Sequence, residues 1–283
     1  MSLTILSNAR FNGIHALLLV VTLSVGVGCK GSSNTVPDDQ GSLITTPQDQ
    51  QLPDTNAASA PFITKATVAL EANDWKRAIQ AYNKAIEADP NNWELYMDRA
   101  IAESKKPDFR TALASMRTAM EMGGDRDWLA WYNLGNIYTN RGMFAEASTA
   151  YRVSLGLQDT PHMETLLNLS GAYIFLFRFD EARSTLDHML TMTPSDHRVI
   201  HNHAMIFHLE QRYDEALAGY DNALEIEPTF AQSHFNRADV LSKLKRPQEA
   251  RAAYQAYLKY EPEGAYATRA RNRIEMLTQK INK

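Results

Sequence analysis

The sequence contains a single cysteine, Cys29, among its 283 residues. One cysteine cannot form a disulfide within the chain, so no internal disulfide framework supports the fold. The formal net charge is −4 and there is no long basic run. Binding of nucleic acid through its phosphates therefore has little basis. The hydrophobic content of the chain, 44%, is ordinary for a globular protein.

Short catalytic motifs are also missing. The sequence has no Gly-rich phosphate loop, no Gly-x-Ser-x-Gly elbow, no His-Glu-x-x-His and no cysteine beside a histidine. The carboxylates are spread along the chain, and the repeats described below leave hardly any residues for a catalytic domain. We therefore expect a protein that is not an enzyme and that uses no cofactor and no metal.

The N-terminus has the layout of a secretory signal peptide over residues 1–28. A polar start carrying Arg10 precedes the apolar run of residues 16–27, which is shorter than the roughly 20 residues of a spanning helix. Gly28 and Cys29 follow this run, which resembles the lipobox of bacterial lipoproteins, where the cysteine is lipidated. The lipobox has a large aliphatic residue three places before the cysteine. This sequence departs from that pattern, because Gly26 stands at that place. A lipid anchor at Cys29 and a plain signal peptide with a free cysteine both remain open.

Residues 29–58 differ in composition from the rest of the chain. They are rich in Ser, Thr, Pro, Asp and Gln and have almost no large apolar side chains. Such a segment cannot bury enough surface to fold, so we predict a disordered tether. As a coil it would span roughly 30 Å.

A repeat with a period near 34 residues occupies the remainder. An alanine recurs at spacings of 34, 35, 35, 34 and 34 residues: Ala78, Ala112, Ala147, Ala182, Ala216 and Ala250. Four places after each alanine stands a large residue: Tyr82, Met116, Tyr151, Leu186, Tyr220 and Tyr254. Fixed small and large apolar places at this period predict stacked helix-turn-helix units.

The repeat resembles the tetratricopeptide repeat. Residues 128–161 carry the family pattern nearly whole, with Trp131, Gly135 and Tyr138 on a first helix and Ala147 and Tyr151 on a second. The resemblance implies an all-α, right-handed superhelix, an α-solenoid of six repeats. We place the repeats at residues 59–92, 93–127, 128–162, 163–196, 197–230 and 231–263. Residues 264–283 are predicted to form a capping helix, because one apolar face recurs there at helical spacing.

Three histidines lie close together in repeat five, in the stretch VIHNHAMIFH of residues 199–208. At about 100° per residue, His201 and His203 point to nearly opposite sides of a helix. His201 and His208 share a face but lie roughly 10 Å apart along the axis, too far to hold one metal ion. His197 and His201 have helical ligand spacing without a third ligand. We therefore predict solvated or groove-lining histidines.

An asparagine occupies the sixth place of four consecutive repeats: Asn133, Asn168, Asn202 and Asn236. Repeats one and two have Thr64 and Asp98 there instead. An amide offers both a donor and an acceptor, so a line of amides can pair with an extended main chain. The resemblance implies such a peptide-binding ladder on the concave side. The alternative is that asparagine is simply common at this place in the family.

Places five, nine, twelve and thirteen of the first helices share a stripe that we expect to face the same groove. The predicted groove residues are Tyr132, Asn136, Leu167, Ile174, Phe175, His201, Met205, His208, Leu209 and Phe235. Apolar residues on a helix are usually core, so burial of this stripe is the alternative to a binding surface. No lysine stands at place five, which disfavours the partners of the chaperone-binding subgroup.

These features together predict a non-catalytic scaffold that is lipid-anchored in the cell envelope and binds a peptide segment of an envelope protein. Lys30 after the cysteine indicates the outer membrane, facing the periplasm, in a diderm bacterium. The architecture is similar to the pilotin lipoproteins that assist secretins of type IV pili. An adaptor for a protease or peptidoglycan enzyme and a self-associating scaffold are the alternatives, and the oligomeric state stays open.

Overall fold

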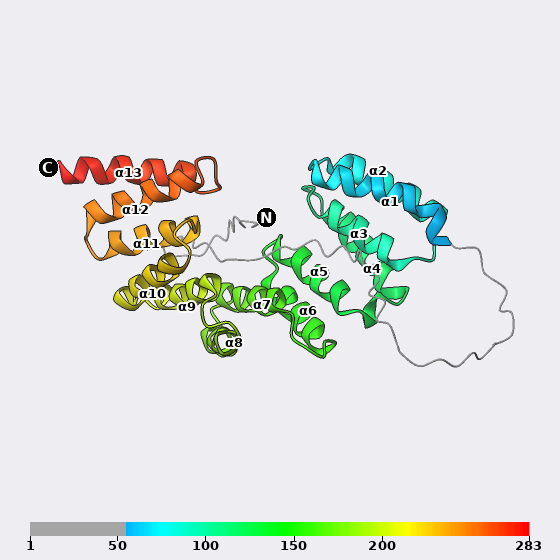
Figure 1. The fold of residues 1–283 in the computed structure, drawn as a ribbon, viewed down its shortest axis with the longest axis horizontal. Helices are drawn as coiled ribbons and strands as arrows, with labels where there is room; N and C mark the ends of the chain where they lie inside the picture. Colours follow the sequence, from blue (N-terminus) through cyan, green and yellow to red (C-terminus); the bar gives the residue numbers. More distant parts are fainter. Residues whose placement is uncertain (1–54, 283) are drawn as a thin grey trace, which may run out of the picture. The chain divides into compact units, whose positions relative to one another are not determined.

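The computed structural model describes residues 55–282, shown in Figure 1. The predicted signal peptide, Cys29 and the tether up to residue 54 lie outside the described residues. Within them the chain forms thirteen α-helices and one short 3-10 helix, and no strand. The predicted all-α fold is confirmed. None of the helices in this part of the chain has the length and apolar character needed to cross a bilayer.

The helices alternate in pairs along the chain. The first helices of the six pairs are α1 (Thr55–Glu71), α3 (Trp93–Glu103), α5 (Trp128–Thr139), α7 (Met163–Phe175), α9 (His197–Leu209) and α11 (Ala231–Lys243). The second helices are α2 (Trp75–Ala88), α4 (Arg110–Glu121), α6 (Phe144–Gly156), α8 (Phe179–Met192), α10 (Tyr213–Ile226) and α12 (Pro247–Tyr260). The 3-10 helix η1 (Gly124–Arg126) follows α4, and α13 (Ala267–Ile281) ends the described chain.

The helix bounds can be set against the predicted repeat bounds. The first helices of repeats two to six begin at residues 93, 128, 163, 197 and 231, the residues at which we place those repeats. The first helix begins earlier than we placed it, at Thr55, so the last residues assigned to the tether are helical. Pro61 lies inside this helix. The capping helix begins at Ala267, three residues after its predicted bound.

The chain divides within α5 into two compact units, an N-terminal unit of residues 55–133 and a C-terminal unit of residues 134–282. In the N-terminal unit α1 to α4 each pack against the next helix, and small residues such as Ala78 and Ala102 lie with Tyr82 in a core cluster. In the C-terminal unit the main cluster is aromatic. It is built around Tyr220, Phe235, Tyr254 and Tyr257.

The turn between the two helices of a repeat uses a left-handed backbone conformation. Five residues two places before a second helix have positive φ: Asn73, Gly142, Phe177, Gln211 and Lys245. Glycine adopts this conformation after a helix without strain. For a residue with a Cβ, the conformation is less favourable by about 1 kcal/mol or more. Phe177 is the unusual case, because it is bulky and its side chain is 57% exposed.

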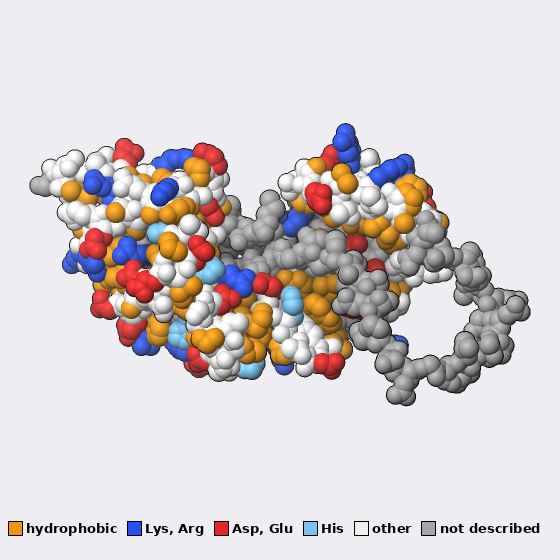
Figure 2. Space-filling view, in the orientation of Figure 1, with side chains coloured by type: hydrophobic (Ala, Val, Ile, Leu, Met, Phe, Trp, Pro, Cys, Tyr) orange, Lys and Arg blue, Asp and Glu red, His pale blue; other side chains and the backbone are white. Residues whose placement is uncertain are grey.

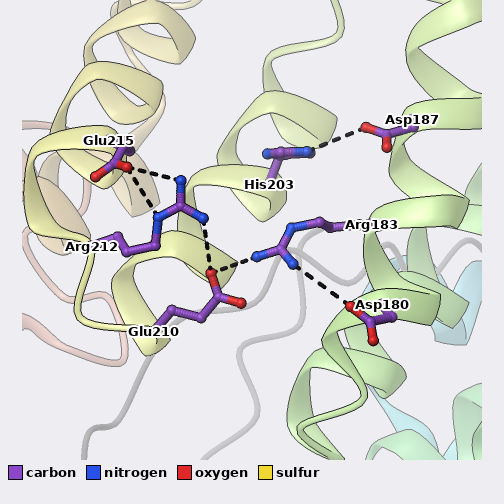
Figure 3. A network of polar contacts seen from close by, with 7 residues as sticks. All are labelled: Asp180, Arg183, Asp187, His203, Glu210, Arg212 and Glu215. Atoms are coloured by element: carbon purple, nitrogen blue, oxygen red, sulfur yellow. Dashed lines mark hydrogen bonds and ion pairs between the residues drawn. The ribbon is translucent and has the colours of Figure 1, made fainter.

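A polar network joins repeat four to repeat five in the C-terminal unit (Figure 3). It contains Asp180, Arg183, Asp187, His203, Glu210, Arg212 and Glu215. The central contact is the ion pair of Arg183 Nη2 with Glu210 Oε2 at 2.5 Å, between α8 and the end of α9. The Arg212 guanidinium lies 4.4 Å from the Phe207 ring centre, and Arg183 lies 5.7 Å from it. On the face seen in Figure 2, acidic and basic side chains lie close together over α9 and α10.

Candidate functional site

The first helices of the last three repeats form a row in the C-terminal unit. Both α7 and α11 contact α9, and each also packs against a second helix. We call α7, α9 and α11 the inner-helix row. Because these helices have neighbours on several sides, they are buried over most of their circumference. Every residue from Thr165 to Ile174 on α7 is buried.

The predicted asparagine ladder lies inside this packing rather than on an open face. The four asparagines are at most 2% exposed. Asn168 Nδ2 donates to Asn136 Oδ1 at 3.0 Å, and Asn236 Nδ2 donates to His201 Nε2 at 3.3 Å. In the N-terminal unit, Asn133 Nδ2 lies 3.5 Å from Met97 Sδ.

These three amide contacts share one pattern. Each joins a place-six asparagine to the first helix of the preceding repeat, 32 to 36 residues earlier in the sequence. The asparagines therefore couple consecutive repeats, which is a structural role that the sequence spacing did not reveal. Their use by a partner stays a prediction.

Most of the predicted groove residues are buried as well. Eight are at most 3% exposed: Tyr132, Asn136, Leu167, Ile174, His201, Met205, His208 and Phe235. The expectation that their side chains form an open stripe differs from the structure, because neighbouring helices cover the stripe. Phe175 and Leu209 are only half-buried, and the Phe175 ring stacks on Phe144 with ring centres 4.2 Å apart. These two positions are where the row approaches the surface.

The three clustered histidines have different environments. His201 is buried, and its Nδ1 lies 2.7 Å from Ser233 Oγ. His203 is half-buried and its Nε2 lies 3.3 Å from Asp187 Oδ1. His208 is also buried, so of the two predicted environments, solvated or groove-lining, the solvated one does not hold for His201 and His208. Both of these pack on the Tyr220 ring, as expected for residues that share a helix face.

No group of three or more metal-ligating side chains comes together anywhere in residues 55–282. The histidines instead pair with hydroxyl, amide or carboxylate groups, or pack on aromatic rings. The arrangement therefore offers hydrogen bonding and packing, rather than coordination, to anything that binds the row.

Some buried polar atoms on the row and on α5 have no hydrogen-bond partner within the described residues. They include Asn136 Nδ2 and both ring nitrogens of His208. Burial lowers the pKa of His208 to about 4, with help from the nearby Lys243, His201 and Arg269. The ring is thus neutral at pH 7, with one nitrogen able to donate and the other able to accept. An unpaired buried polar group costs about 1–3 kcal/mol, so these atoms favour a ligand that pairs with them.

One polar cluster was missed from the sequence. Asp239 on α11 accepts hydrogen bonds from the Tyr254 hydroxyl and from Arg269 Nη2, the latter at 3.1 Å. Arg269 belongs to α13, for which the sequence indicated only a capping role. The sequence did contain one signal for this cluster. Asp239 stands at place nine of repeat six, where repeats four and five have the uncharged residues Gly171 and Met205.

Comparison with known proteins places these observations in a family. A TPR-repeat model matches residues 205–245, and tetratricopeptide-repeat models match residues 231–263 and residues 63–107 and 97–161. The chain is therefore a tetratricopeptide-repeat protein, as its repeat pattern predicted. Proteins of this class act as protein-binding scaffolds.

Individual relatives agree with this assignment. A protein SGT1 homolog of Oryza sativa subsp. japonica is 38% identical over 66 residues, which is 23% of this chain and 18% of that relative. The match thus spans less than a fifth of the curated relative's length. Among solved structures, PilW, a widely conserved type IV pilus biogenesis factor, superposes with a TM-score of 0.64 at 17% identity. That match covers 74% of this chain and 96% of PilW.

PilF of Pseudomonas aeruginosa is a second similar structure. It has a TM-score of 0.59 at 16% identity, and the match covers 77% of this chain and 98% of PilF. At these identities both likenesses show the fold alone.

Proposed function

We propose that this chain is a non-catalytic scaffold, anchored in the cell envelope through a lipid on Cys29, that binds an extended segment of an envelope protein. The segment lies along the inner-helix row. The observation that carries the proposal is the line of buried amide and imidazole groups on α5 and this row. It includes Asn136 Nδ2 on α5 and both His208 ring nitrogens on α9, which have no hydrogen-bond partner within the described residues.

An extended main chain suits these groups. Each residue of such a segment presents one N–H and one C=O, which match the donor of Asn136 and the donor and acceptor of His208. Each hydrogen bond contributes a net of about 0.5–1.5 kcal/mol. Because the row is buried, the segment must replace contacts between first helices, and we expect binding to alter the spacing of adjacent repeats.

Within this class, we infer a pilotin-like role in the assembly of a pilus secretin. The support is the fold shared with PilW and PilF, together with the predicted anchor and tether. The chain would then be an outer-membrane lipoprotein facing the periplasm. Deletion of the protein is expected to abolish secretin multimers in the envelope. Intact multimers with accumulated substrate proteins would indicate an adaptor instead.

The anchor has its own test. Cys29→Ser is expected to move the protein from the membrane fraction to the soluble envelope fraction and to abolish labelling with a fatty-acid analogue. Unchanged fractionation and labelling would contradict lipid anchoring.

Site-specific photo-crosslinking tests the binding face. A photoreactive amino acid at Leu209, half-buried at the end of α9, is expected to capture one envelope protein in living cells. The matched control is Ile226, which is exposed at the end of the second helix of the same repeat. Capture at Ile226 but not at Leu209 would place the partner on the outer helices and contradict the proposal. Capture of the chain itself would indicate self-association.

A further inference from the structure

Three basic side chains lie on the last helix of the inner-helix row and on the capping helix. Lys243 lies in the last turn of α11, and Arg269 and Arg273 lie one turn apart on α13. Basic side chains are visible over α12 and α13 in Figure 2. Lys243 and Arg273 are exposed, and neither forms an ion pair with another residue of the described chain.

Arg269 is held in place by the polar cluster of Asp239. Its Nη2 lies 3.1 Å from Asp239 Oδ2, and its guanidinium carbon lies 5.3 Å from the centre of the Phe235 ring. The Asp239 side chain is nearly buried and also accepts from the Tyr254 hydroxyl. Arg269 and Asp239 therefore neutralise one another, whereas the charges of Lys243 and Arg273 remain uncompensated at this end of the row.

His208 connects these charges to the interior. It is 1% exposed, and neither ring nitrogen has a hydrogen-bond partner in residues 55–282. Lys243 and Arg269 both lie close enough to lower its pKa. His201, on the same helix, and Tyr213 and Tyr220, on α10, complete its surroundings. The end of the row thus combines two exposed cations with a buried neutral imidazole, none of which is paired with another described residue.

We propose that this cationic end binds an acidic side chain, Asp or Glu, of the partner segment, with Lys243 and Arg273 facing the carboxylate and His208 donating a hydrogen bond. The inference rests on the proposed function, because it specifies the segment that the row binds. Charge complementarity selects the occupant. Buried apolar residues such as Met205 and Phe235 lie on the same row of helices. The negative charge of Asp239 makes the site too mixed in sign to bind a run of phosphates.

The effect of the acidic residue should be measurable but moderate. Exposed ion pairs are worth little each, while a hydrogen bond from a buried group to a charge is stronger. We expect about a tenfold preference for a segment with the acidic residue over its amide counterpart, and we expect salt to weaken that preference.

The experiment uses the full chain and synthetic peptides with amidated C-termini, so that only side chains supply carboxylates. Three first helices about 10 Å apart span the length of roughly nine extended residues. Peptides of this length with alternating Leu and Ser carry a single Glu at each place in turn, and twin peptides carry Gln. Fluorescence anisotropy gives the dissociation constants for the wild type and for Lys243→Gln, Arg273→Gln and His208→Leu.

The matched control is Lys245→Gln, because Lys245 is an exposed lysine two residues from Lys243. Thermal unfolding of each variant establishes that it is folded. We expect a Glu peptide to bind about ten times more tightly than its Gln twin to the wild type and to Lys245→Gln. We expect this preference to be smaller in Lys243→Gln, Arg273→Gln and His208→Leu, and smallest in His208→Leu. Equal binding of Glu and Gln peptides to the wild type would overturn the inference and leave the proposed function standing. Binding of neither set would count against both.

Discussion

At the scale of single residues, His208 is the clearest conflict between stability and binding. A buried imidazole without hydrogen-bond partners destabilises the fold, and replacing it with an apolar residue of similar size removes that cost. Its unpaired nitrogens make sense if they serve a ligand. Binding sites commonly retain groups that are unfavourable for stability alone.

The pH dependence of stability tests this environment. The pKa of His208 falls from 6.5 to about 4 on folding. As the pH drops through this window, the unfolded chain takes up a proton that the folded chain does not, so the free energy of unfolding decreases by up to roughly 3 kcal/mol. His208→Leu should lose less stability than the wild type between about pH 7 and about pH 4.5 in urea unfolding. An identical loss in both proteins would contradict the assigned environment.

Asp98 stands at the ladder place of repeat two, in the N-terminal unit. Burial and the charge of Glu94 raise the pKa of this carboxyl from 3.8 to about 7. Near neutral pH, a fraction of the molecules therefore carries a protonated carboxyl, which can both donate and accept as an asparagine does. The chemistry of place six is thus more alike in repeats two to six than the sequence suggests.

A substitution checks the raised pKa. Between pH 3.8 and about 7 the folded state holds a proton that the unfolded state has lost, so the wild type loses stability as the pH rises through this range. Asp98→Asn cannot titrate. Its free energy of unfolding should exceed that of the wild type by more at about pH 8 than at about pH 5. A difference that does not change with pH would show that Asp98 titrates normally.

At the scale of helices, the repeats depend on close approach of small residues. A Cβ added at Gly219 on α10 would lie 2.6 Å from the Cβ of Ala204 on α9 and 3.3 Å from its Cα. Both contacts are with parts of α9 that cannot rotate away. The two helices of repeat five can therefore pack only because glycine faces alanine.

Gly219→Ala should accordingly lower the free energy of unfolding by about 1–3 kcal/mol. Gly156→Ala is the matched control, because nothing lies within 4 Å of a Cβ at Gly156, the last residue of α6. That change should be neutral or stabilising by a few tenths of a kcal/mol. Chemical denaturation measures both, and equal effects of the two substitutions would refute close approach as the cause.

The sequence predicts the helices well because each one is marked locally. The repeated alanine, the large residue four places later and the residues that end each repeat recur at a fixed period, and five first helices begin where that period places them. The start of α1 could not be predicted, since Pro61 and a polar composition hide the helix that begins at Thr55.

The candidate site is less visible in the sequence because burial depends on packing between repeats. Place six can be identified from asparagine spacing, yet only the structure shows that Asn168 and Asn236 bond to the preceding repeat. The link of Arg269 to Asp239 spans 30 residues and joins a capping helix to a repeat. No local pattern encodes such a contact.

At the scale of the whole molecule, the two compact units divide the ladder. Asn133 lies in the N-terminal unit, whereas Asn168, Asn202 and Asn236 lie in the C-terminal unit with the unpaired groups of the row. The C-terminal unit therefore carries the groups that we propose to bind the partner segment. A solenoid made of such units binds through the sum of many modest contacts, so no single substitution need abolish binding.

The most direct test of binding along the inner-helix row is co-purification of the partner from crosslinked envelopes. The two proteins compared are the wild type and a variant with Asn168, Asn202 and Asn236 all changed to Ala. Circular dichroism and a cooperative thermal transition would first establish that the variant is folded. We expect the envelope protein captured at Leu209 to co-purify with the wild type and to be lost, or reduced at least tenfold, with the folded variant. Undiminished recovery with the variant would mean that the asparagines serve only to couple the repeats, and would contradict binding along the inner-helix row.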